Sequence, residues 1–136
     1  MYARILVAMA LDHQVSDKTL EFARFACAPG GKIIALHVLE EPTGTANARL
    51  REDLQAEGTK RAQELFREKL SAFPEVEPKL VQGHVSRTIL EYAAQNDVEC
   101  IVMGSHKPGL VDHLIGSTAA RVVRHATCSV HIYRGE

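Results

Sequence analysis

Short strand-like runs alternate along this chain with segments of helical periodicity, and no other feature of the sequence constrains the fold as strongly. Most of the runs are rich in Ile, Val and Leu without a polar face, which is typical of strands buried on both sides of a sheet. We expect strands at residues 4–9, 32–39, 77–82, 100–104 and 129–133. Strands that alternate with helices in this way predict a parallel sheet with helices on both faces.

The segments between the strands carry apolar residues at the spacing of amphipathic helices. We expect helices at residues 17–27, 49–73 and 86–96, and a last helix from Ser117 onward. Ser86 and Ser117 have side chains that favour an N-cap, and Pro29, Gly30 and Gly31 should end the first helix. Because right-handed crossovers leave few topologies, we predict a single-domain α/β fold with an open parallel sheet of strand order 3-2-1-4-5.

Length and composition favour one soluble cytoplasmic domain and exclude several classes of function. The chain has 136 residues, 46% of them hydrophobic and 24% charged, with a formal net charge of -1. This near-neutral balance, with only 5% aromatic residues, offers no basis for binding nucleic acid or an anionic membrane surface. Cys27, Cys100 and Cys128 form no CxxC pair, so we expect neither a disulfide framework nor a zinc site. We also expect no signal peptide and no membrane span.

The predicted strand order changes direction between the first and fourth strands, and ligands of open α/β sheets bind at such a switch point. The loop after the fourth strand, residues 104–118, contains Gly104, Gly109 and Gly116, followed by Ser117 and Thr118. Glycine lets a backbone approach a ligand closely, and free N–H groups at a helix N-terminus bind anions. The two hydroxyls can donate further bonds, and His106 or Lys107 can add charge. This loop is therefore our candidate phosphate site.

The motifs of other nucleotide sites and of common catalysts do not occur. The loop matches neither GxGxxG nor GxxxxGK[ST], and residues 8–13 after the first strand contain no glycine, which disfavours classical NAD binding and P-loop hydrolysis. Asp12, His106 and His113 are candidate hydrolytic bases by position alone, with no accompanying triad or carboxylate pair. His84, His106 and His113 lack the spacing of a metal site. We expect a binding protein without catalytic or metal-ligating residues.

Several separate segments, taken together, resemble the universal stress protein family over residues 1–136. They are ILVAM in the first strand, ALHVLE in the second, GHVSRTILEYAAQNDVECIVMGSH, and the closing GSTAARVVRHATCSVHIYR. The signature of that family after the fourth strand is G-x2-G-x9-G-[ST]. The resemblance implies the same fold, which is like that of the adenine nucleotide alpha hydrolases. It also implies binding of ATP, with or without Mg²⁺, by a homodimer that serves in stress response or signalling.

The site residues implied by the resemblance form a base-binding group and a phosphate-binding group. The first group lies at the strand ends and comprises Ala10, Asp12, Val38 and Met103. The second group lies in the loop and comprises Gly104, His106, Lys107, Gly109, Gly116, Ser117 and Thr118. The amides of Gly116, Ser117 and Thr118 are expected to hold the phosphate tail.

Two departures from the family pattern bear on nucleotide affinity. The second signature glycine falls on Lys107, with Gly109 two residues later, and the loop is one residue shorter, as in the short-loop small bacterial type. The Asp that usually follows the first strand falls on Ala10, so Asp12 or the backbone of Ala10 would have to replace it. These departures favour one alternative, a dimeric scaffold that binds no nucleotide. A slow ATPase or self-phosphorylating protein is the other.

The last predicted strand lies at an edge of the sheet, where its unpaired backbone groups need a partner. Antiparallel pairing with a symmetry-related copy would supply one. The family resemblance likewise implies a homodimer through this strand, which comprises Val130, His131, Ile132 and Tyr133.

Overall fold

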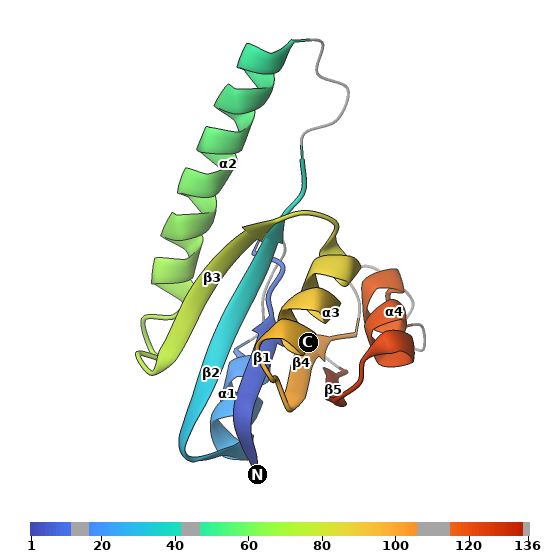
Figure 1. The fold of residues 1–136 in the computed structure, drawn as a ribbon. Helices are drawn as coiled ribbons and strands as arrows, with labels where there is room; N and C mark the ends of the chain where they lie inside the picture. The colour runs from blue at the N-terminus through green and yellow to red at the C-terminus, as the bar shows by residue number, and fades with distance from the viewer. Residues whose placement is uncertain (12–16, 42–46, 106–114, 135–136) are drawn as a thin grey trace.

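The computed structural model describes residues 1–11, 17–41, 47–105 and 115–134 of the chain. Its elements, in chain order, are β1 (Tyr2–Ala8), α1 (Lys18–Ala26), β2 (Cys27–Leu39), α2 (Ala48–Lys69), β3 (Val76–Gln82), α3 (Val85–Gln95), β4 (Cys100–Gly104), α4 (Ser117–His125) and β5 (Ser129–Tyr133). Strands and helices alternate throughout this part of the chain, as the sequence predicts (Figure 1).

The strands form a 5-stranded sheet of order β3-β2-β1-β4-β5, and every neighbouring pair is parallel. The predicted fold class and strand order are therefore confirmed. In the centre of the sheet, Leu6 of β1 lies beside Ile34 of β2 on one side and Ile101 of β4 on the other. All three side chains are buried, as expected for strands covered on both faces.

Helices cover both faces of the sheet, and each face has its own hydrophobic core. Leu20 and Ala23 of α1 and Phe66 of α2 pack with Val7 and Val102 on one face. The second core joins β1, β2 and β4 to α3 and α4, through Leu6, Leu36, Ile89, Ile101 and Val122. Figure 1 shows α3 and α1 on opposite sides of the sheet. The first core lies on the α1/α2 face of the sheet and the second on the α3/α4 face.

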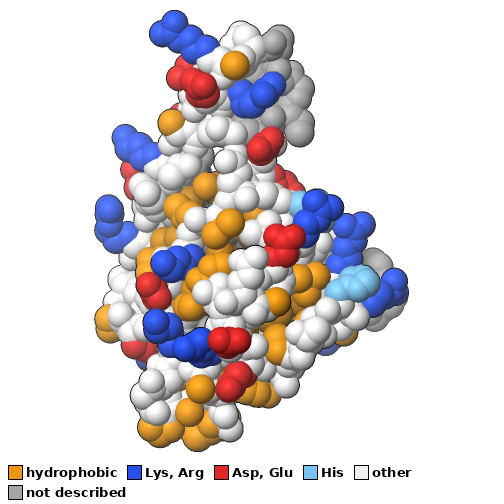
Figure 2. Space-filling model, in the orientation of Figure 1, with side chains coloured by type: hydrophobic (Ala, Val, Ile, Leu, Met, Phe, Trp, Pro, Cys, Tyr) orange, Lys and Arg blue, Asp and Glu red, His pale blue; other side chains and the backbone are white. Residues whose placement is uncertain are grey.

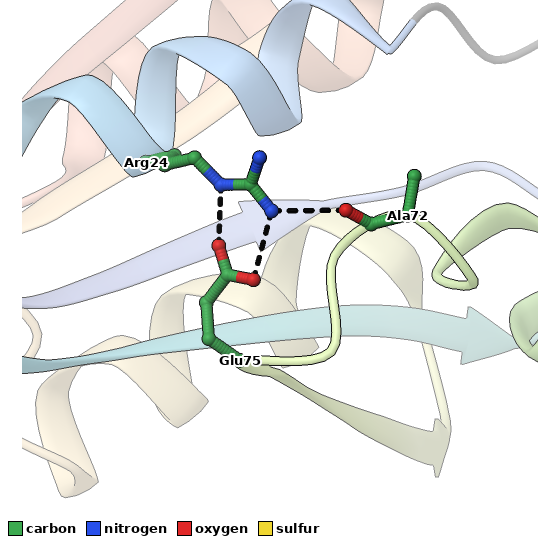
Figure 3. Close-up of polar contacts among 3 residues, drawn as sticks. All are labelled: Arg24, Ala72 and Glu75. Carbon is green, nitrogen blue, oxygen red and sulfur yellow. Dashed lines mark hydrogen bonds and ion pairs between the residues drawn. The ribbon is translucent and has the colours of Figure 1, made fainter.

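An ion pair joins the α1/α2 face to the turn that precedes β3 (Figure 3). The guanidinium of Arg24 donates to both carboxylate oxygens of Glu75, at 2.5 and 2.8 Å, and to the Ala72 carbonyl at 2.9 Å. The same group lies 4.4 Å from the ring centroid of Phe73. The bond to Arg24 lowers the pKa of the Glu75 carboxyl below its ordinary value. One side chain of α1 thus contacts three residues between α2 and β3: Ala72, Phe73 and Glu75.

The N-terminal part of α2 extends beyond the sheet, and Figure 2 shows charged side chains spread along it. Leu50 and Leu54 are also exposed there. The helix begins after Asn47, whose side chain accepts a bond from the Leu50 amide at 2.7 Å. No helix in the described ranges is both long enough and apolar enough to cross a bilayer.

Several predicted boundaries are wrong by a few residues, among them the start of β1 at Tyr2 rather than at residue 4 and the end of α2 at Lys69 rather than at residue 73. β2 begins at Cys27 rather than at residue 32, because Cys27 pairs with Tyr2 across a shift in register. Gly31 is needed at this place, since a Cβ there would lie 2.9 Å from the Ala3 carbonyl oxygen. The cap of α3 is His84 rather than Ser86, with the imidazole accepting from the Arg87 amide at 3.4 Å. The cap of α4 is Gly116, so Ser117 is the first helical residue.

Candidate functional site

The switch point predicted from the sequence lies between β1 and β4, which pair directly from Ile5 with Cys100 to Val7 with Val102. After β1 the chain continues to α1 on one face of the sheet, and after β4 it continues to α4 on the other face. The helices that follow these two adjacent strands thus lie on opposite faces of the sheet, the arrangement at which ligands of open α/β sheets bind.

Both ends of the loop after β4 are held together by backbone hydrogen bonds of Ser105. The Ser105 amide donates to the Tyr133 carbonyl at 3.0 Å, and the Gly116 amide donates to the Ser105 carbonyl at 2.5 Å. Ser105 itself is only 3% exposed. These bonds place the start of α4 directly beside the end of β4. Sequence reasoning did not single out Ser105, although it is the polar residue that follows a wholly apolar strand.

The bond from Gly116 bears on one predicted role. The Gly116 amide, which was expected to hold the phosphate tail together with those of Ser117 and Thr118, donates to the Ser105 carbonyl in this structure. The first helical backbone bond runs from the Ala120 amide to the Gly116 carbonyl at 2.9 Å. In the described part of the chain, the amides of Ser117, Thr118 and Ala119 find no acceptor. These N–H groups are the donors that a helix start leaves for an anion.

The electrostatics of the α4 start also favour an anion. No acidic residue occupies the first turn of α4, and Arg124 and His125 lie in its last turn. The positive end of the helix dipole is therefore not neutralised by a carboxylate of the helix itself. Ser117 is exposed and Thr118 half-buried, so both hydroxyls lie near enough to the surface to add to the backbone donors.

Gly104 ends β4 beside this helix start and is exposed. A Cβ built on Gly104 would meet no heavy atom within 4 Å, and its φ is not among the positive values recorded for glycines in the described residues. Neither packing nor backbone conformation therefore requires glycine at this position. Open space above a strand end is what a ligand needs to approach a backbone closely.

The predicted base-binding side chains lie on one face of the sheet. Val38 at the end of β2 and Met103 at the end of β4 are 7% and 6% exposed and belong to the core of the α3/α4 face. Ala8, at the end of the intervening strand, packs against the same core. Together these side chains form an apolar floor at the carboxyl edge, with Ala10 exposed beyond it.

Several predicted site residues lie outside the described residues. These are Asp12, His106, Lys107 and Gly109 of the predicted nucleotide site, and His113 among the candidate bases. Within the described ranges, no group of three or more His, Cys, Asp or Glu side chains is placed to hold a metal ion. His84, the remaining residue of the weighed metal set, caps α3 instead.

The cysteines are not poised for chemistry. Burial is the main cause that raises the pKa of the Cys27, Cys100 and Cys128 thiols, which keeps them protonated and unreactive near neutral pH. Cys100 belongs to the core of the α1/α2 face and Cys128 packs against the α3/α4 face. The sheet therefore separates these two thiols.

The fold and this edge define a parallel α/β domain whose switch point brings adjacent strand ends beside a helix start that has no side-chain cap among the described residues. A model of the universal stress protein family matches residues 1–134. Universal stress protein G of Salmonella typhimurium is 30% identical over 150 residues, covering 98% of this chain and 100% of that protein. The chain belongs to the universal stress protein family.

Solved structures show the same fold at lower sequence identity. Hypothetical protein MJ0577 superposes with a TM-score of 0.81 at 23% identity, covering 100% of this chain and 98% of that one. A universal stress protein in complex with cAMP gives a TM-score of 0.68 at 21% identity, over 98% and 99% of the two chains. The universal stress protein of Archaeoglobus fulgidus in complex with dAMP gives 0.57 at 22%, over 96% and 97%.

Proposed function

We propose that this universal stress protein binds ATP at the β1–β4 switch point, as a cytoplasmic homodimer that acts in stress response or signalling. The observation that carries the proposal is the pair of Ser105 bonds to Tyr133 and Gly116. They hold the α4 start, whose first amides have no acceptor among the described residues, beside Gly104, where a Cβ would meet no heavy atom within 4 Å. A phosphate chain lying across this edge would meet donors from the helix and no side chain from the strand.

The two complexes with cAMP and dAMP support an adenine nucleotide as the ligand. In this chain the base would lie over Val38, Met103 and Ala8, and the phosphates would extend from there toward Ser117 and Thr118. An apolar floor with a small number of polar groups around it is the usual composition of a small-molecule site. Mg²⁺ binds largely through nucleotide phosphates, so it enters the proposal as part of the ligand.

The homodimer is proposed on the state of β5. Within the described residues β5 pairs only with β4, which leaves its other edge without a strand. Val130, His131, Ile132 and Tyr133 are all half-buried in the single chain. A second copy paired with this edge would satisfy its backbone groups and cover the remaining apolar surface.

The test is to identify what co-purifies with the protein. The protein, expressed in bacteria and purified without added nucleotide, is denatured, and the released small molecules are identified by mass spectrometry. The proposal expects an adenine nucleotide that a short unfolding and refolding step removes. A second preparation, loaded with ATP, should melt at a higher temperature than the stripped protein, because a ligand of the native state stabilises it. If stripped and loaded samples melt alike, the dimeric scaffold that binds no nucleotide is the better account.

A further inference from the structure

A buried histidine fastens the backbone at the end of β1. His37 lies on β2 and is 8% exposed. Its Nδ1 lies 2.8 Å from the Met9 carbonyl oxygen and 3.2 Å from the Leu11 amide nitrogen. The imidazole meets the ring of Phe66 edge-on, with centroids 6.5 Å apart and an interplanar angle of 87°. His37 is the side chain at which the β1–β2 ladder ends.

The backbone ladder between the two strands ends just before this contact. Ala8 is the last residue of β1 that pairs with β2, and the Met9 amide still donates to the Leu36 carbonyl at 2.8 Å. Beyond that point the side chain of His37 takes the place of the next backbone partner. Since a neutral imidazole nitrogen either donates or accepts, one tautomer bonds the Met9 carbonyl and the other bonds the Leu11 amide.

This contact determines the direction of the peptide groups of Ala10. In a planar trans peptide the C=O and the following N–H point in opposite directions, and the described residues contain no cis peptide bond. The Met9 carbonyl and the Leu11 amide both point at the imidazole. The Ala10 N–H and the Ala10 carbonyl must therefore point away from it. Met9 and Leu11 are 4% and 5% exposed, whereas Ala10 is exposed.

One exposed residue thus presents a backbone donor and a backbone acceptor side by side. Adenine carries the complementary pair, because its N6 amino group donates and the neighbouring ring nitrogen N7 accepts. Guanine and hypoxanthine have a carbonyl oxygen at position 6 instead, which the Ala10 carbonyl would repel. We propose that His37 is a positioning residue that turns the Ala10 peptide groups toward the base and so makes the site select 6-aminopurines over 6-oxopurines. This inference rests on the proposed function, since it describes the base end of the same site.

The experiment compares ATP with ITP, which has an oxygen in place of the 6-amino group. Isothermal titration of the stripped wild-type protein with each nucleotide measures the selectivity. We expect ATP to bind about tenfold more tightly, in the range of a bidentate base contact. His37→Leu keeps a side chain that fills the core but cannot bond Met9 or Leu11, so both the ATP affinity and the selectivity should fall, the latter to near equality. His37→Asn offers an amide donor and acceptor close to the Nδ1 position, so it should keep most of the selectivity.

Two measurements on the protein without nucleotide test whether His37 bonds the backbone of Met9 and Leu11. Nitrogen NMR of the His37 ring identifies which nitrogen carries the proton, and hydrogen exchange reports on the Leu11 amide. We expect a slowly exchanging Leu11 amide in the wild type and in His37→Asn, and fast exchange in His37→Leu. Equal affinities for ATP and ITP in the wild type would overturn this inference while leaving nucleotide binding intact. Equal selectivity in the wild type and in His37→Leu would overturn the role of His37. A wild type that binds neither nucleotide would refute the proposed function as well.

Discussion

Gly104 allows the ligand site to be tested without disturbing the fold. Because a Cβ there would meet no atom within 4 Å and the backbone φ is not in the positive range, Gly104→Ala fits the native structure. Such a replacement stabilises a protein by about 0.4–1 kcal/mol, since it restricts the unfolded chain. For a domain of this size the melting temperature should rise by about 1–4 °C.

The same methyl group should weaken nucleotide binding. A phosphate oxygen that reaches a backbone N–H lies about 2.9 Å from the nitrogen, so a new methyl group on the strand end would obstruct its approach. The loss of one hydrogen bond to a charged group costs about 1.5–3 kcal/mol. The affinity for ATP should therefore fall by about tenfold or more.

The assay pairs thermal unfolding with isothermal titration, and α2 offers a matched control. A Cβ on Gly58 would likewise meet nothing within 4 Å, and this residue lies within α2, where it faces the ends of β2 and β3 rather than the end of β4. Gly58→Ala should raise stability by up to about 1 kcal/mol and leave ATP affinity unchanged. A Gly104→Ala protein that binds ATP as tightly as the wild type would show that Gly104 is not at the nucleotide site, and one that melts several degrees lower would show that glycine is needed there for the fold.

Further predictions concern the elements that support the site. Arg24→Gln should lower the melting temperature and leave ATP affinity unchanged, as checked by calorimetry. Arg24 lowers the pKa of the Glu75 carboxyl. The stability that this ion pair contributes is therefore present above the ordinary carboxyl pKa and is lost as the pH falls through the lowered pKa of Glu75. Because Arg24→Gln has no such contribution to lose, its unfolding free energy should fall less steeply in acid than that of the wild type. Gly83 has φ +153° and a built Cβ 2.6 Å from Thr88 Oγ1, so Gly83→Ala should cost about 1–3 kcal/mol in urea unfolding. Adding Thr88→Ala to Gly83→Ala should recover only the part of the lost stability that the contact with Thr88 causes. Recovery of the full wild-type stability would contradict a cost from the positive φ. Ile132→Lys at the β5 edge should sediment as a monomer at concentrations where the wild type is a dimer, and an unchanged dimer would exclude that edge as the interface.

The alternation of strands and helices was enough to predict the sheet and its order, because apolar runs such as IVM in β4 have only one stable environment in a small domain. The start of β2 was missed for a physical reason. Pro29, Gly30 and Gly31 are local signals for a turn, but pairing between Cys27 and Tyr2 extends the strand through them. Tertiary contacts outweighed local preference there.

The candidate site was predictable in outline because strand order and glycine positions pointed to the same edge of the sheet. Its internal bonding was not predictable. Two features depend on how the ends of the loop meet in space: which amide donates to the Ser105 carbonyl, and which amides at the α4 start have no acceptor among the described residues. The role of His37 also depends on a contact between different strands. The sequence signal for it was a polar residue within the apolar run of residues 33–39.

The central claim is that this chain binds ATP at the carboxyl edge between β1 and β4. Its most direct test is isothermal titration of ATP, with Mg²⁺ present, into protein stripped of nucleotide. The account predicts saturable binding with a dissociation constant below about 1 mM, lost or strongly weakened in Gly104→Ala but kept in Gly58→Ala. Titration without saturable heat at millimolar ATP, together with an unchanged melting temperature, would contradict it.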